Sequence, residues 1–289
     1  MFLIFDTETT GLPRNWNAPL TDADNWPRCV QIAWQLHGKD GNCISHENYL
    51  IRPDGFSIPY DAEKIHGIST VLAEADGFPL AEVLEKFEEA LRQCEFIGGH
   101  NVKFDLNILG AEFLRLNAQN PLKDFPIIDT CTEETASICQ LTGGRGGKFK
   151  LPTLAELYKH LFDTDFEEAH NATADVEATT RCFFELLRTG RIRPDALKNR
   201  EDILHNLKEV LKAPVRGIGL KHFNLRAASA QLVSNNELEE PHKKLTNTEE
   251  EVMHKTPFVH LHTHSQYSVL QSTSRIIDLI KTASVDGMP

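Results

Sequence analysis

Two acidic residues, Asp6 and Glu8, directly follow a short apolar run, Phe2–Phe5, at the start of the chain. The run has high strand propensity and is bounded by Gly11, so it predicts a buried strand. Because side chains alternate between the faces of a strand, Asp6 and Glu8 share one face with Phe2 and Ile4. A hard divalent cation would relieve the repulsion between two such carboxylates. The pair alone fits either a metal site or two unrelated acids at a solvated strand end.

The segments that follow predict an α/β fold. Strands are expected at residues 29–36 and 43–51, and turn chemistry between them gives an antiparallel meander with the first strand. Further strands are expected at 95–99 and 126–130. Helical spacing predicts helices at 61–65, 80–94, 100–117, 133–141, 151–162 and 203–211. Residues 170–175 lead into a further helix, which ends near 188.

Two loops leave alternatives open. The loop 13–28 carries Trp16 and Trp26, which either stack on nucleobases or fold the loop onto the body, and folding onto the body is favoured. The loop 142–150 is rich in glycine and basic residues, but Thr142 and Phe149 break the spacing of a phosphate-binding P-loop. It is either a mobile basic loop that touches a backbone phosphate or a flexible linker.

Composition narrows the function classes. The chain has 289 residues and a net charge of −12, which argues against a protein that binds nucleic acid through its overall charge. Its six cysteines form no C-x-x-C pair, so a zinc ribbon or redox motif is not expected. The first apolar run is too short for a signal peptide, and no segment has the apolar length of a membrane span. We expect a protein of a reducing cytoplasm that has no membrane partner.

Further polar residues complete a constellation. Asp105 follows Asn101 by four residues, which predicts that both point to one side of a helix. Asp175 is expected in the first turn of a later helix. Four acids on three elements match a site for two divalent cations about 3.5–4 Å apart, which supports phosphodiester cleavage. Such a reaction also needs a general base, and His170, His66 and His100 are all candidates on chemistry alone.

Three segments, FDTETTGL, HNVKFD and HNATAD, resemble the three motifs of the DEDDh family of 3′→5′ exonucleases, most of all the epsilon-type proofreading domain of bacterial DNA polymerase III. The resemblance covers roughly residues 1–188. It implies a ribonuclease H-like fold, with a mixed five-stranded sheet flanked by helices. It also implies that Asp6, Glu8, Asp105 and Asp175 bind two Mg²⁺ or Mn²⁺ ions and that His170 is the general base.

The resemblance further implies a pocket for the 3′-terminal nucleotide of DNA, single-stranded or frayed, with Leu12 wedged against a base. The residues expected to bind substrate are Thr7, Thr9, Thr10, Gly11, Leu12, Ile65, His66 and Asn101.

The C-terminal part differs in character. Residues 189–257 are expected to form a helical extension and a polar linker, 213–257, in which residues 231–234 faintly resemble sliding-clamp peptides. Residues 258–289, FVHLHTHS onward, resemble the opening of the PHP domain of the polymerase III alpha subunit. His262 and His264 would then belong to an incomplete second metal site, unless the histidines have no role. The chain is therefore expected to begin a longer bacterial alpha chain.

The leading hypothesis is a metal-dependent 3′→5′ exonuclease that releases nucleoside monophosphates from DNA during proofreading. One alternative is an exonuclease of the same fold that trims RNA or acts in repair. Another is a non-catalytic adaptor between polymerase and clamp, although the complete set of acids and histidine disfavours it.

Overall fold

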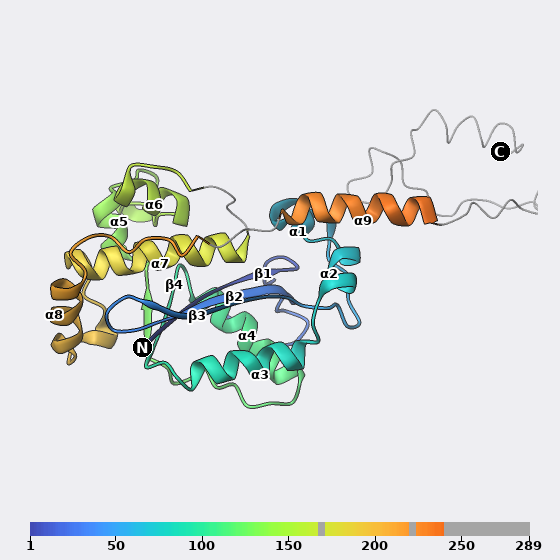
Figure 1. Ribbon diagram of the computed structural model, residues 1–289, viewed down its shortest axis with the longest axis horizontal. Coiled ribbons are helices and arrows are strands. Elements are labelled where there is room, and N and C mark those ends of the chain that lie inside the picture. Colours follow the sequence, from blue (N-terminus) through green and yellow to red (C-terminus); the bar gives the residue numbers. More distant parts are fainter. Residues whose placement is uncertain (167–170, 220–223, 240–289) are drawn as a thin grey trace, which may run out of the picture. The chain divides into compact units, whose positions relative to one another are not determined.

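The first predicted strand is β1 (Phe2–Thr9), the central strand of a sheet in the order β3-β2-β1-β4-β5 (Figure 1). β2 (Cys29–His37) and β3 (Cys43–Leu50) form the antiparallel meander with it. On its other side, β4 (Phe96–Gly99) and β5 (Ile127–Asp129) pair in parallel. The expected α/β fold with a mixed five-stranded sheet is confirmed. This computed structural model describes residues 1–166, 171–219 and 224–239, and residues 1–230 form one compact unit.

Helices cover both faces of the sheet because β1 is apolar on both. Phe2 and Ile4 pack in a core shared with α7 (Ala172–Thr189), whereas Leu3 and Phe5 pack in a second core on the opposite face. Figure 1 shows α7 along one face and α3 and α4 along the other. The other helices described are α1 (Tyr60–His66), α2 (Thr70–Asp76), α3 (Leu80–Leu91), α4 (Lys103–Arg115), α5 (Glu133–Cys139), α6 (Leu154–Phe162), α8 (Glu201–Val210) and α9 (Leu225–Glu239), with 3₁₀ turns at Arg145–Gly147 and Asp195–Leu197.

Helix α7 lies unusually close to the sheet. A Cβ atom added at Gly98 in β4 would lie 2.7 Å from the ring of Phe183, so only glycine allows this approach. The helix begins at a side-chain cap, because Asn171 accepts a hydrogen bond from the Thr173 N–H. It ends at Gly190, whose φ of 66° suits a left-handed C-cap. The close approach at Gly98 holds α7 against the sheet, and the cap at Asn171 sets where its first turn begins.

One prediction about the second motif is wrong. Asn101 lies outside the helix that carries Asp105, because α4 begins only at Lys103. The backbone at Asn101 has a φ of 58°, and its N–H donates to the carboxylate of Asp129 at 2.8 Å. This turn interrupts the helix that spacing alone predicts, so Asn101 and Asp105 do not share a helical face.

The predicted linker 213–257 contains a helix, α9, which corrects that expectation. Leu225 and Ser229 of α9 are buried. The Ser229 hydroxyl donates to the Gly67 carbonyl at 2.7 Å and accepts from the Ser69 N–H at 3.0 Å. These partners lie about 160 residues earlier, so local composition could not indicate the contact. The predicted elements and histidines of 258–289 lie outside the described residues.

The loop 13–28 is folded onto the body, as the favoured interpretation predicts for Trp26. The indole of Trp26 is buried and donates to the Pro19 carbonyl at 3.1 Å. The Arg115 guanidinium donates to the carbonyls of Ala23 and Trp26 at 2.7 and 2.6 Å. Trp16 behaves differently, because half of its side chain is exposed. Hydrogen bonds within the loop and to Arg115 of α4 thus hold the loop against the rest of the fold.

The lysines of the glycine-rich loop 142–150 are engaged in ion pairs. Lys148 pairs with Glu133, and Lys150 pairs with Glu156 at 2.7 Å. In the described parts of the chain, no helix combines the length and apolar character that crossing a membrane requires.

Candidate active site

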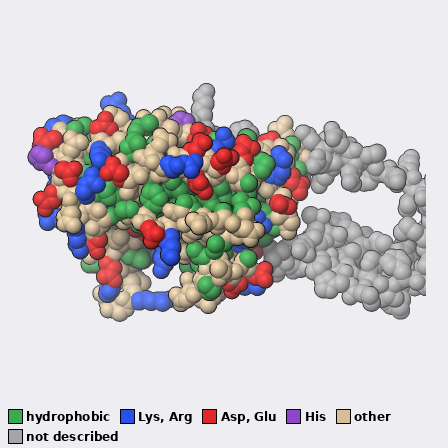
Figure 2. Space-filling view, turned by 90° about the horizontal axis from the view of Figure 1, so that it is seen from below, with side chains coloured by type: hydrophobic (Ala, Val, Ile, Leu, Met, Phe, Trp, Pro, Cys, Tyr) green, Lys and Arg blue, Asp and Glu red, His purple; other side chains and the backbone are tan. Residues whose placement is uncertain are grey.

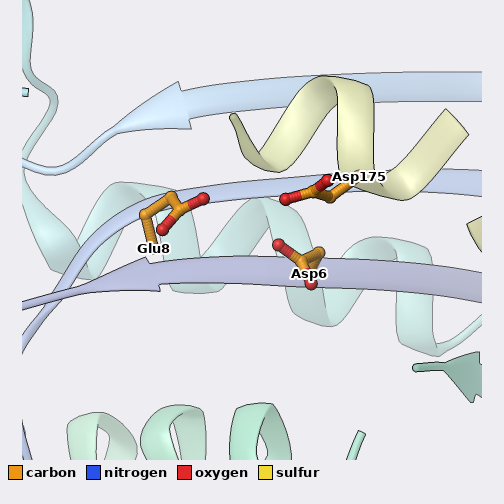
Figure 3. Close-up of side chains that lie close together, drawn as sticks. All are labelled: Asp6, Glu8 and Asp175. Carbon is orange, nitrogen blue, oxygen red and sulfur yellow. The ribbon is translucent and has the colours of Figure 1, made fainter. Parts of the chain in front are cut away.

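Strand alternation decides where Asp6 and Glu8 point. They share the face of β1 with Phe2 and Ile4, which pack under α7, and the first turn of α7 carries Asp175. Figure 3 shows the three carboxylates turned toward one another from the two elements. One oxygen atom from each of the three lies within 4.8 Å of the others. The structure thus brings together three of the four acids that the sequence singles out.

Burial and mutual repulsion make this a costly place for negative charge. Burial, followed by the charges of Asp105, Asp175 and Glu8, raises the pKa of Asp6 well above its ordinary value. Burial raises the pKa of Glu8 to about 8, with further contributions from Asp175 and Asp105. Within the described residues, these acids form a group whose geometry and charge fit a hard divalent cation.

Asp105 reaches the site from the other side of β1. Thr7 lies on the face opposite Asp6, and its hydroxyl and N–H donate to Asp105 Oδ1 at 2.6 and 3.0 Å. Burial raises the pKa of Asp105 to about 7, while the two bonds from Thr7 counteract that rise. Asp105 lies outside the group of three, yet its charge raises the pKa of both Asp6 and Glu8. It is therefore a close fourth acid with its orientation fixed by Thr7.

Sequence reasoning missed Asp129, a further acid at this edge of the sheet. It ends β5, and its Oδ1 accepts hydrogen bonds from the N–H groups of Asn101 and Cys131, both at 2.8 Å. Burial raises its pKa, and its charge contributes to the raised pKa of Asp105. Its position at the carboxyl end of β5, which pairs in parallel with β4, is the feature of the sequence that could have indicated it. Its bonds fix the turn before α4 and so position Asp105.

A family model for exonucleases, RNase T, matches residues 3–183, which include all of these acids. The chain belongs to the exonuclease family.

Known relatives agree with this assignment. The chain is 28% identical over 184 residues to a PolC-type DNA polymerase III from Mycoplasma genitalium, an alignment that covers 63% of this chain and 11% of the relative. The corresponding Lactococcus lactis protein is 27% identical over 236 residues, covering 81% and 13%. The chain thus spans only about an eighth of the length of these polymerases.

Among solved structures, exonuclease I superposes with a TM-score of 0.52 at 23% identity, covering 72% of this chain and 43% of that one. An E. coli exonuclease I complex with a dT13 oligonucleotide gives 0.51 at 23% identity, covering 72% and 45%. At this identity the likeness shows a shared fold, which is the ribonuclease H-like fold expected from the sequence.

Two of the three histidines considered as general base, His100 and His66, are hydrogen-bonded to neighbouring parts of the chain. His100 Nε2 donates to the Pro152 carbonyl at 3.0 Å, and its Nδ1 faces the Thr130 hydroxyl at 2.9 Å. Burial lowers the pKa of His100 to about 4. His66 is buried, and its Nδ1 accepts from the Ile68 N–H at 3.1 Å. His170 lies outside the described residues, so its role as general base stays a prediction.

The predicted substrate residues at the end of β1 differ in exposure. Thr9 is buried and donates to the Gly11 carbonyl at 2.7 Å, while Thr10 accepts from the Arg28 N–H at 2.9 Å. Gly11 has a φ of 145°, which favours glycine. Leu12 is 73% exposed, which suits a side chain that contacts a ligand. Among the predicted substrate residues on other elements, Ile65 and Asn101 are also exposed, whereas His66 is buried.

A hollow of about 450 Å³ adjoins this segment and brings positive charge to it. Thr10, Gly11 and Leu12 line it together with Arg14, Asp24, Arg28 and Arg115. Arg28 and Arg115 share one buried partner, Glu112, at 3.0 and 3.2 Å, so this trio retains one positive charge. The charge is local, because Figure 2 shows acidic and basic side chains interspersed over one face of a chain whose net charge is −12.

Proposed function

We propose that the chain is a metal-dependent 3′→5′ exonuclease that releases nucleoside monophosphates from DNA. The observation that carries the proposal is the convergence of Asp6, Glu8 and Asp175, with their oxygen atoms within 4.8 Å of one another. Such a cluster of half-buried acids is stabilised by bound cations and is typical of phosphodiester hydrolysis by two metal ions.

The residues fit two Mg²⁺ or Mn²⁺ ions. Asp6, Glu8 and Asp175 would hold them, with Asp105 as the fourth acid on the far side of β1. Bound divalent cations supply a lower pKa for the attacking water and positive charge against the phosphate in the transition state. One of the similar structures is the zinc-bound form of an E. coli exonuclease I complex with single-stranded DNA, which supports a metal requirement in this fold.

The chain's own residues would position the acids, bind the DNA and accept a proton. Thr7 holds Asp105 in one orientation through two hydrogen bonds to the same oxygen. Leu12, exposed beyond Gly11, would pack against the 3′-terminal base, while the arginines of the adjoining hollow attract the backbone phosphates. His170, five residues before Asp175, would take the proton of the attacking water.

We further propose that the activity proofreads for a replicative polymerase. The support is the similarity to PolC-type DNA polymerase III chains, together with the resemblance of residues 258–289 to the start of a PHP domain. The remainder of an alpha chain would then follow this one. The same proposal includes domain boundaries at residues 188 and 257, a sliding clamp as a further partner and a bacterial cytoplasmic setting. In it, His262 and His264 belong to an incomplete second metal site whose other ligands this chain lacks.

The test is digestion of a primer labelled at its 5′ end, with a paired or mispaired 3′ end, in Mg²⁺ and in EDTA. We expect stepwise shortening from the 3′ end, faster on the mispaired primer, and none in EDTA. Asp175→Asn should abolish shortening, whereas Asp202→Asn, a change of an exposed acid on α8, should not. Equal shortening by Asp175→Asn, or release of the label from the 5′ end, would refute the proposal. Faster digestion of a matching RNA would favour the RNA-trimming alternative.

A further inference from the structure

The three tryptophans of the chain have different environments. Trp26 and Trp34 are 3% and 2% exposed, so hydrophobic packing accounts for both. Trp16 is 51% exposed, although its indole is among the most costly side chains to leave in water. Burial against the chain's own core therefore explains only part of its placement.

The backbone around Trp16 is held rigidly. The Asn15 N–H donates to Asn25 Oδ1 at 2.7 Å, and Asn25 Nδ2 donates back to the Asn15 carbonyl at 3.0 Å. On the other side of Trp16, the Asn17 N–H donates to Asn15 Oδ1 at 3.0 Å. Asn25 is itself buried. The buried Asn25 amide thus holds Asn15, and the Asn15 side chain in turn holds Asn17. Fixing both neighbours of the half-exposed ring lowers the entropy cost of binding through that ring.

The ring contacts a residue of the second acidic motif. Its centroid is 5.8 Å from that of Phe104, and the ring planes are inclined at 49°, so the two rings are not stacked face to face. Phe104 directly precedes Asp105 in the first turn of α4, and neighbouring Cα atoms are about 3.8 Å apart. Trp16 also follows the exposed Leu12 by four residues. Trp16 is therefore near Leu12 in the sequence and in contact with the neighbour of Asp105.

We infer that Trp16, supported by Phe104, is a stacking site for an unpaired base on the 5′ side of the 3′-terminal nucleotide. This inference rests on the proposed exonuclease function and extends it to a second subsite. Every base has a π-face, so an exposed indole holds a single strand without reading its sequence. A base in a duplex is already stacked on its neighbours, so the subsite favours frayed ends.

The experiment uses the full chain with Ca²⁺ in place of Mg²⁺ and follows tryptophan fluorescence while dTMP or thymidine oligonucleotides are added. Trp26 and Trp34 are buried, so quenching by a stacked base reports on Trp16. We expect quenching by a tetranucleotide or longer strand, little by dTMP, and none in Trp16→Phe. Equal quenching by dTMP, or quenching that persists in Trp16→Phe, would overturn the inference.

A steady-state measurement in Mn²⁺ provides a second readout. Trp16→Ala should raise the KM for a single-stranded octamer by about 5- to 150-fold, the effect expected for loss of one base-stacking contact. The matched control is Ile44→Ala on the edge strand β3, where a similarly exposed side chain is removed and the KM should stay the same. An unchanged KM in Trp16→Ala contradicts the subsite. If wild-type protein releases no nucleotide while quenching is intact, the proposed function fails and the subsite does not.

Discussion

Replacing Thr7 by valine tests how the site controls the ionisation of Asp105. Valine keeps the shape of threonine and the backbone N–H, but it removes the hydroxyl that donates to Asp105 Oδ1 at 2.6 Å. A hydrogen bond to a charged group contributes about 1.5–3 kcal/mol. Since a change of one pH unit in pKa corresponds to about 1.4 kcal/mol, the pKa of Asp105 should rise by roughly one to two pH units.

This rise has a calculable effect on metal binding. In the metal-free site the pKa of Asp105 is about 7, so about half of the carboxyls are ionised at pH 7. In Thr7→Val the ionised fraction at pH 7 should be roughly 1–10%. Protons compete with metal for the carboxylate, so the Mg²⁺ concentration for half-maximal activity should rise by about 5- to 50-fold. At pH 9 the difference should shrink to about twofold or less, because roughly half or more of the carboxyl is then ionised in the variant and nearly all of it in the wild type.

The assay is nucleotide release from a single-stranded 3′ end over a range of Mg²⁺ concentrations at pH 7 and pH 9. Thr179→Val is a matched control on α7, because the Thr179 hydroxyl is buried and has no hydrogen-bond partner among the described residues. It should leave the Mg²⁺ requirement unchanged. If Thr7→Val requires no more Mg²⁺ than wild type at pH 7, or if its deficit persists undiminished at pH 9, the reasoning about Asp105 is refuted.

Three further changes test the surrounding structure. Gly98→Ala should lower the free energy of unfolding by about 1–3 kcal/mol, because its Cβ meets Phe183, and Phe183→Leu should restore part of it in thermal melts; additive losses would contradict this contact. Ser229→Ala should lower the free energy of detaching α9 from Gly67 and Ser69 by about 1–3 kcal/mol. Hydrogen exchange at the Ser69 amide, which donates to Ser229, should then be faster, and unchanged exchange there would argue against docking of α9. The pKa of Glu8 is raised to about 8, so between about pH 4.5 and 8 this carboxyl binds more protons in the folded metal-free chain than in the unfolded one, and its contribution to stability should fall as pH rises. Buried His100, whose pKa is lowered from 6.5 to about 4, has the opposite effect only below about pH 6.5, so thermal melts in EDTA from pH 6.5 to 8 should show the fall and saturating Mg²⁺ should reduce it; a melting temperature that rises over this range in EDTA would contradict the sign.

The sequence predicts the sheet and the position of the first acids because both depend on local patterns. The period of two in Phe2–Phe5 places Asp6 and Glu8 on the face that α7 covers, and the structure has them there. Asp175 is equally predictable, since the first turn of a helix follows from its cap at Asn171. Strand alternation and the start of a helix are therefore enough to predict where Asp6, Glu8 and Asp175 lie.

The remainder depends on contacts between distant segments. The start of α4 is displaced from Asn101 by a hydrogen bond to Asp129, 28 residues later. The support of Asp105 by Thr7 joins residues 98 positions apart, and neither residue alone indicates it. Helix α9 forms in a polar segment because Ser229 finds partners at Gly67 and Ser69. Periodicity and composition contain no signal for such pairs, which tertiary packing selects.

The central claim is that Asp6, Glu8 and Asp175 form the metal centre on which nucleotide release depends. Calorimetric titration of the metal-free chain with Mn²⁺, alongside nucleotide release by the same samples, tests this claim most directly. We predict two Mn²⁺ ions per wild-type chain, and in Asp175→Asn weakened binding together with lost release. Undiminished Mn²⁺ binding in Asp175→Asn, or release by wild-type protein without divalent metal, would contradict the claim.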